Sequence, residues 1–424
     1  MLASLQLTDG TETAVLSGGT GTFLGATYAP RPSDGTSTVV EEATVTLEGT
    51  AANVLLDTQK VERLLALARS APANVKVYVQ FQRTGDARVW RARVRDGRLI
   101  WSDDSVLRRL NATATAVSVV VAWERDGLWE CATAQSLGTK PLFNGDGAGT
   151  DPDGYVVATV GADAYNAVEF AAVNIEGTHA APAHLILKNN DGAAASLERV
   201  YFANDVFGRF EGGEHLVSGA TLSWGNNSTH GLPIYQYRTL TADQVAGIVA
   251  AGGVRLLAVF SDLPSGIYLR AWMLQKQGSA AIYSTAWTGP EVLTDGRKVI
   301  DLGFCPSPPN VRSFSGWYLA FSVYADVADT AELEFVQLCP GLDLLMLEIT
   351  DIDPWADDGT LEWWGADRYA ELNAWHGEVR ATGRLMLQPQ RANRIMTLVE
   401  GANGVDNTLA LTLTAKLNAL RATV

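Results

Sequence analysis

"PLFNGDGAGTDPDG", residues 141–154, divides the chain into two strand-rich parts. Its four glycines, three aspartates and two prolines favour turns, and it carries too little apolar surface to fold by itself. We therefore expect a linker over 141–154, with separately folded parts before and after it.

The composition favours a globular, all-β chain with few short helices. At 424 residues two or three domains are expected, and 47% hydrophobic with 19% charged residues is typical of packed cores. The 40 glycines and 12 tryptophans suit many turns and aromatic-filled β-sandwiches. The net charge of −15 argues against nucleic-acid binding, which needs a basic face.

Cysteine usage and the N-terminus bear on where the protein is made. Cys131, Cys305 and Cys339 show no metal-binding or disulfide spacing, so we interpret them as small buried hydrophobic residues. The N-terminus lacks the pattern of a signal peptide, and the longest apolar stretch, near 116–123, is too short to span a bilayer. We expect synthesis and assembly in a cytoplasm, without membrane insertion.

Residues 1–140 are predicted to form a β-sandwich with one helix. Alternating apolar residues predict strands over 43–47, 75–82 and 117–123. An apolar stripe predicts a helix over 57–70 that Asp57 caps. Asp96-Gly97 is typical of a type I′ turn, so we expect a hairpin between 90–95 and 98–101.

Residues 155–340 are predicted to form a jelly-roll β-sandwich of eight or nine strands. One helix interrupts it: Thr241 and Gln244 form a capping box, and Gly252 ends the helix.

Residues 341–424 are predicted to pack on the first domain. They contain a strand over 344–349, a short helix over 389–400 and an alternating strand over 409–417. About 80 residues are few for an independent core, so we expect these strands to pair with 1–140. The jelly roll would then be an insertion.

Three clusters are candidates for binding. Aromatic and acidic residues alternate over 351–375, where Trp355, Trp363, Trp364 and Trp375 are possible glycan contacts, and a packing cluster is the favoured alternative. Arg91, Arg93 and Arg95 share one strand face and are a possible subunit interface, the alternative being an ordinary solvated face. Asp146, Asp151 and Asp153 are weak calcium candidates, because their spacing does not match an EF-hand.

Catalytic signatures do not occur in the sequence. It holds no HExxH, GxSxG, Walker or dinucleotide-binding motif, so we expect no enzyme and no cofactor.

Three segments, "LQLTDGTETAVLSGG" (5–19), "VYVQFQRTGDARVWRARVRDGRLIW" (77–101) and "VSVVVAWERDGLWE" (117–130), together with the helix, resemble tail proteins of siphophages and prophages. The similarity is to the distal tail, or baseplate, family. It implies a virion structural protein whose N-terminal domain forms a trimeric or hexameric ring beside other tail proteins. The second sandwich would project for reinforcement or attachment to a host-surface glycan. A carbohydrate-binding or carbohydrate-active protein using the Trp355–Trp375 region is the alternative.

Overall fold

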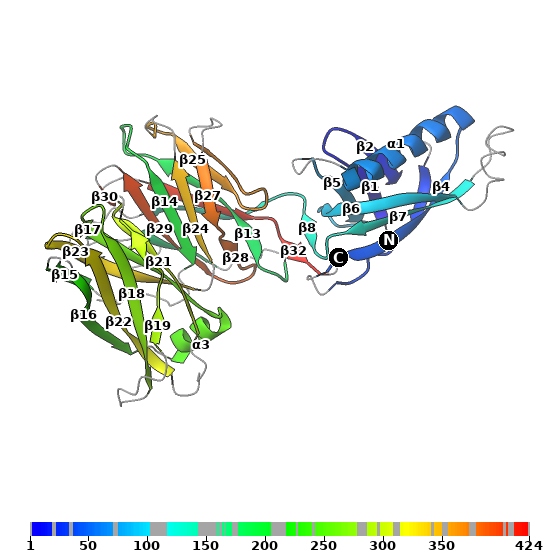
Figure 1. Ribbon diagram of the computed structural model, residues 1–424. Coiled ribbons are helices and arrows are strands. Elements are labelled where there is room, and N and C mark those ends of the chain that lie inside the picture. Colours follow the sequence, from blue (N-terminus) through cyan, green and yellow to red (C-terminus); the bar gives the residue numbers. More distant parts are fainter. Residues whose placement is uncertain are drawn as a thin grey trace. The chain divides into compact units, whose positions relative to one another are not determined.

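A computed structural model gives the architecture of the chain (Figure 1). It describes residues 2–18, 23–33, 37–70, 75–101, 117–142, 159–160, 163–164, 166–171, 177–204, 218–225, 228–239, 242–277, 286–294, 297–307, 314–340, 343–349, 355–372, 379–401, 404–405 and 411–422. The all-β prediction is confirmed, because antiparallel sheets dominate the described residues. Contacts divide the chain into two compact units. Unit 1 comprises residues 1–135, 174–181 and 418–424, and unit 2 comprises residues 136–173 and 182–417.

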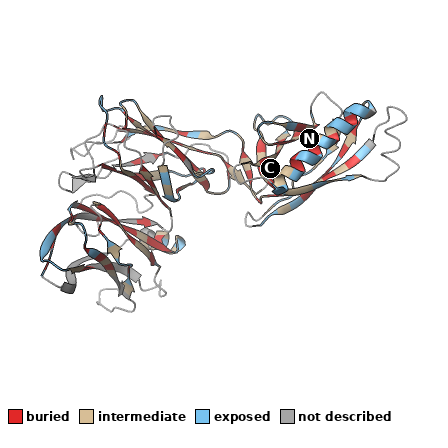
Figure 2. Ribbon diagram, turned by 45° about the horizontal axis from the view of Figure 1, so that its top comes forward, coloured by how far each residue is buried: buried red, intermediate tan, exposed pale blue. Residues whose placement is uncertain are grey.

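Unit 1 is one curved sheet with a helix on it, where two stacked sheets were expected. The main strand order is β2-β1-β5-β6-β7-β4-β3, and β8 joins β6 to the last strand of the chain, β32. The strands are β1 (Leu2–Thr8), β2 (Thr13–Ser17), β3 (Phe23–Thr27), β4 (Val39–Leu47), β5 (Val77–Arg83), β6 (Trp90–Trp101), β7 (Val117–Arg125), β8 (Trp129–Cys131) and β32 (Leu420–Arg421). Buried side chains alternate with more exposed ones along β4 and β5, as the sequence predicts (Figure 2).

Helix α1 begins earlier than predicted. It spans Ala51–Ser70, and its first amides bond to Thr50 rather than following a cap at Asp57. The predicted stripe is confirmed, because Val61, Leu64 and Leu65 are buried against the sheet. The helix extends further toward its N-terminus than predicted because the buried Val54 continues the apolar stripe for two more turns.

Strand β6 runs through Asp96-Gly97 without a turn, so the predicted hairpin is wrong. Residues 90–101 form one strand, and its register against β7 shifts between Val94 and Asp96, which marks a bulge. A Cβ at Gly97 would lie 2.5 Å from Leu65 Cδ2 and 2.8 Å from the Ala122 carbonyl oxygen. Glycine is required there because the helix crosses the strand too closely for a side chain.

A buried ion pair lies in the core of unit 1. Arg125 Nη2 is 2.6 Å from Glu41 Oε1, and the two side chains are 0% and 1% exposed. Glu41 also accepts hydrogen bonds from the Tyr28 hydroxyl at 2.6 Å and the Arg31 amide at 2.7 Å. The Arg125 guanidinium lies 4.4 Å from the centre of the Trp129 ring. Burial and the neighbouring Glu41 carboxylate raise the pKa of Tyr28 far above its ordinary value.

Unit 2 contains a two-sheet sandwich, which we call the carrier sandwich. Its first sheet has the order β12-β29-β14-β24-β27 with β30 beside β29, and its second has the order β26-β25-β13-β31-β9 with β28 beside β13. The strands are β9 (Gln135–Leu142), β12 (Asn166–Phe170), β13 (Ala181–Asn189), β14 (Arg199–Asn204), β24 (Leu344–Ile349), β25 (Thr360–Trp364), β26 (Tyr369–Leu372), β27 (Val379–Gly383), β28 (Met386–Leu387), β29 (Asn393–Gly401), β30 (Gly404–Val405) and β31 (Leu411–Leu417). A two-stranded pair, β10 (Thr159–Val160) and β11 (Asp163–Ala164), is separate.

The return of the C-terminal region to unit 1 is limited to its last residues. The predicted strands at 344–349 and 409–417 exist as β24 and β31, but β24 pairs with β14 and β27, and β31 pairs with β13 and β9. Only 418–424 belong to unit 1, where β32 pairs with β8. The predicted helix over 389–400 is also corrected, because β29 occupies Asn393–Gly401.

A two-sheet β-sandwich is confirmed within the region predicted as a jelly roll, but only over 218–340, because the strands over 166–204 belong to the carrier sandwich. We keep the name jelly roll for residues 218–340. Its two sheets have the orders β15-β23-β17-β21 and β16-β22-β18-β19. The first strand therefore pairs with the last, and the second strand pairs with the second-last, as in a rolled-up hairpin. Helix α3 (Ala242–Ala250) precedes the third strand, and Gly252 follows it with a φ of +75°. The strands are β15 (Ser218–Trp224), β16 (Ser228–Thr239), β17 (Gly253–Asp262), β18 (Tyr268–Gln277), β19 (Ala286–Thr288), β20 (Val292–Leu293), β21 (Val299–Pro306), β22 (Phe314–Ala325) and β23 (Asp329–Pro340).

The jelly roll is inserted between two neighbouring strands of the carrier sandwich. Ala203 of β14 lies opposite Leu344 of β24, so the insertion leaves and re-enters at adjacent positions of one sheet. Tyr201, Met396 and Leu398 of that sheet belong to the same buried core as the jelly-roll strands. The inserted module is therefore packed on the carrier sheet.

Glu400 fixes this packing with polar contacts. Its carboxylate is 2% exposed and accepts hydrogen bonds from the Lys298 amide at 2.7 Å and the Tyr201 hydroxyl at 3.1 Å. Arg199 Nη1 lies 3.2 Å from the same carboxylate. Jelly-roll backbone and carrier side chains thus share one buried acceptor, and leaving it unpaired would be costly.

Candidate functional site

The predicted arginine face of β6 is largely neutralised within unit 1. Arg91 Nη2 lies 3.2 Å from Glu130, and Arg95 Nε lies 2.6 Å from Asp126. The hydrogen bond that Arg95 donates to the Asp126 carboxylate raises the pKa of Arg95 above its ordinary value. Arg93 lies between them on the strand and is half-buried. The face carries less surplus positive charge than three arginines in sequence suggest.

The tryptophans proposed as glycan contacts separate into different environments. Trp355 and Trp363 are 0% and 1% exposed, so neither ring face can stack on a sugar, and the packing alternative accounts for both. Trp364 is half-buried, with its ring centre 5.5 Å from that of His184. Trp375 lies outside the described residues, as do the calcium candidates Asp146, Asp151 and Asp153.

The cysteine prediction is confirmed, because Cys131, Cys305 and Cys339 are buried and none of them forms a disulfide. Burial raises the pKa of the Cys305 thiol to about 12, which removes thiolate character at neutral pH. In the described part of the chain, no group of three or more His, Cys, Asp or Glu side chains is arranged to hold a metal ion. Within the same residues, none of the helices has the length and apolar character that crossing a membrane requires.

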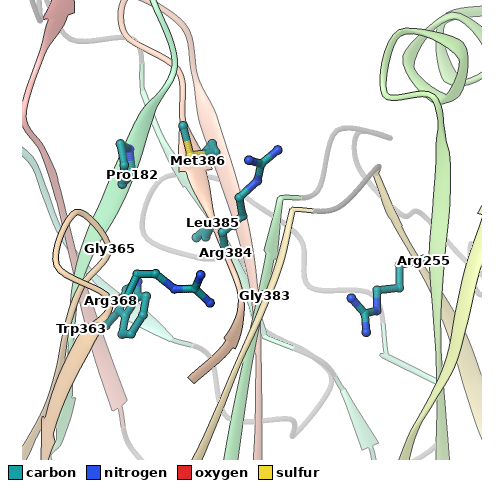
Figure 3. Close-up of a pocket in the computed structure, with 9 residues that line it drawn as sticks. All are labelled: Pro182, Arg255, Trp363, Gly365, Arg368, Gly383, Arg384, Leu385 and Met386. Atoms are coloured by element: carbon teal, nitrogen blue, oxygen red, sulfur yellow. The ribbon is translucent and has the colours of Figure 1, made fainter. Parts of the chain in front are cut away.

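Unit 2 contains a pocket that the sequence did not indicate (Figure 3). Its volume is about 480 Å³, within the usual range of small-molecule sites. Three arginines line it: Arg255 from β17 of the jelly roll, Arg368 from the turn between β25 and β26, and Arg384 from the segment joining β27 to β28. In sequence they span more than a hundred residues without a shared motif, so only the fold brings them together.

The backbone beneath the pocket depends on two glycines. A Cβ at Gly365 would collide with the Ala183 carbonyl oxygen, and a Cβ at Gly383 would collide with the Leu344 carbonyl oxygen. Gly383 also has a φ of +81°, which disfavours any other residue. These close approaches occur where residues 384–385 pass from one sheet of the carrier sandwich to the other.

The three pocket arginines differ in their partners. Arg255 donates from Nε and Nη2 to Asp301, with Nε 2.8 Å from Oδ2, and this bond raises the Arg255 pKa. Arg384 Nε lies 3.7 Å from Asp343, whose pKa burial raises although Arg384 opposes the shift. Arg368 is exposed and has no ionic partner among the described residues.

Comparisons of this chain with protein-family models, with curated proteins and with solved structures found no match.

Proposed function

We propose that this protein is a non-catalytic structural component of a phage tail or tail-like particle, similar to distal tail proteins. In this proposal unit 1 assembles into a ring, and unit 2 displays the jelly roll for reinforcement or for attachment to a host surface. The resemblance of 5–19, 77–101 and 117–130 motivates the proposal.

The observation that carries it is the nested insertion. The jelly roll begins and ends at paired positions of one carrier sheet, Ala203 and Leu344, and packs on that sheet. An inserted module with adjacent ends can be carried without disturbing the host fold. That arrangement suits a protein whose assembling part stays constant while a displayed part varies.

Unit 1 offers a surface for assembly. Arg91, Arg93 and Arg95 lie on the face of β6 opposite the buried Trp90, Ala92 and Val94. Arg91 and Arg95 already pair with Glu130 and Asp126, so the proposal depends mainly on Arg93. Arginine is enriched at protein interfaces because its planar fork pairs with carboxylates, and a chain of net charge −15 supplies carboxylates on neighbouring copies.

Light scattering after size-exclusion chromatography tests the proposal. The expected species is a trimer or hexamer of the 45.4 kDa chain. The protein concentration is kept low enough that nonspecific association does not occur. Arg93→Glu should dissociate the oligomer, because the new carboxylate would repel the acidic residues of the neighbouring copy that Arg93 attracts. Arg391→Glu, the same charge change at an exposed position of unit 2, is the matched control. A monomer at every concentration would contradict self-assembly.

The carbohydrate-binding alternative keeps one discriminating test. Trp364→Ala should weaken binding on a glycan array under this alternative, whereas burial of Trp355 and Trp363 means that their replacement would instead lower stability. Turnover of a polysaccharide would show that a purely structural role is incomplete.

A further inference from the structure

The arginine-lined pocket of unit 2 has the features of a ligand site. We propose that it binds a small carboxylate-bearing molecule of the size of an acidic monosaccharide, with Arg368 as the main contact. The inference does not depend on the assembly proposed above, because every lining residue lies in unit 2.

Arg368 occupies a backbone position that disfavours arginine. Its φ is +55°, in the left-handed region where glycine or asparagine is usual. Asp358 and Gln390 adopt a similar backbone conformation outside the pocket, so the conformation alone does not mark a site; Arg368 differs from them because it lines the pocket. Figure 3 shows the Arg368 and Arg255 side chains extending toward one another from opposite sides of the pocket, while Arg384 extends in another direction.

Arg255 supplies a second, pre-oriented cation. Asp301 holds its Nε and Nη2, which fixes the plane of the guanidinium. Its Nη1 contacts no acceptor within the described part of the chain, so two N–H donors remain for a ligand. A planar carboxylate matches such donors better than a spherical anion does.

Trp363 also lines the pocket, but the residue is only 1% exposed and mainly packs within the sandwich. Its Nε1 donor has no acceptor among the described residues, and the same is true of Trp123 and Trp129 in unit 1. The polar contacts to a ligand are therefore assigned to the arginines. Pro182, Leu385 and Met386 form the apolar part of the wall, which suits an organic molecule with a carbon skeleton.

Calorimetric titration of the full chain with glucuronate tests the assignment, with glucose as the neutral probe and inorganic phosphate as the non-carboxylate anion. We expect heat of binding for glucuronate only. Arg368→Gly should weaken glucuronate binding about tenfold or more, because it removes a charge-assisted hydrogen bond. Arg368→Lys, which keeps the charge without the fork, should retain part of the affinity.

Gln390→Gly is the matched control. Gln390 is exposed, has a φ of +61° and lies outside the pocket, so this change gives the same backbone relief without altering the site. Both glycine variants should keep the wild-type melting temperature or raise it, which separates lost binding from lost folding. Equal binding of glucose and glucuronate, binding of phosphate but not glucuronate, no heat with any probe, or unchanged affinity in Arg368→Gly would overturn the proposal.

Discussion

Glu41 gives the sharpest stability prediction because its carboxylate is the only anion contacting the fully buried Arg125 among the described residues. Glu41→Gln keeps the side-chain shape but removes this charge, so Arg125 is left buried without compensation. Breaking a buried pair on one side costs about 3–5 kcal/mol. For a unit of this size, each kcal/mol lost from the free energy of unfolding lowers the melting temperature by about 2–4 °C, so a decrease on the order of 10 °C is expected.

Differential scanning calorimetry of the full chain measures this shift. The matched control is Glu12→Gln, which breaks the pair between Glu12 and Arg63 on the surface of the same unit; Arg63 is 63% exposed. An exposed pair contributes about 1 kcal/mol or less. The double variant Glu41→Gln/Arg125→Met should be more stable than Glu41→Gln alone, since it removes the uncompensated charge. The reasoning fails if Glu41→Gln and Glu12→Gln shift the transition equally.

Three further outcomes follow from individual contacts. Gly97→Ala should destabilise unit 1 by about 1–3 kcal/mol, because a Cβ would press on Leu65, whereas Gly25→Ala, which meets open space, should change the calorimetric transition little. In native protein at about pH 8, Ellman's reagent should leave Cys305 unmodified and react only after denaturation, since burial keeps its thiol protonated; rapid native labelling would contradict this. The raised pKa of Asp343 means that stability from its protonated form is full at acid pH and is lost as pH rises through the folded-state pKa. Asp343→Asn should therefore melt above the wild type at neutral pH and level with it at about pH 3, and a uniform difference at all pH values would refute the assignment.

Sequence periodicity predicted the regular elements of unit 1 well. Strand β5 was expected because Val77, Val79 and Phe81 alternate with polar residues, and these three side chains are buried. The Asp96-Gly97 prediction was wrong because the same dipeptide suits a turn and a bulge. The deciding fact is the approach of Leu65 from α1, which no local pattern contains.

Strand β29 shows a second limit of periodicity. Ile395, Met396, Leu398 and Val399 are all buried, because the sheet is covered on one face by its partner sheet and on the other by the jelly roll. A strand buried on both faces loses its period of two and cannot be separated from a helix by pattern alone. The incorrect helix at 389–400 follows directly from this double burial.

The pairing of strands was the least predictable feature, and the candidate site depends on it. Strand β31 was recognised as a strand, but its alternation does not specify that β13 and β9 are its neighbours. The pocket arginines were missed for the same reason, since Arg255 lines the same pocket as Arg368 and Arg384 only after the jelly roll packs on its carrier.

Double burial also changes what the insertion implies mechanically. A flexible stem was expected at 141–154, whose residues from 143 onward lie outside the described structure. The described contacts instead join the jelly roll to the carrier sandwich through a shared apolar core and through Glu400, whose carboxylate accepts a hydrogen bond from the Lys298 amide. Separating them would expose Tyr201, Met396 and Leu398 and leave a buried carboxylate unpaired, which are two costs that oppose independent motion.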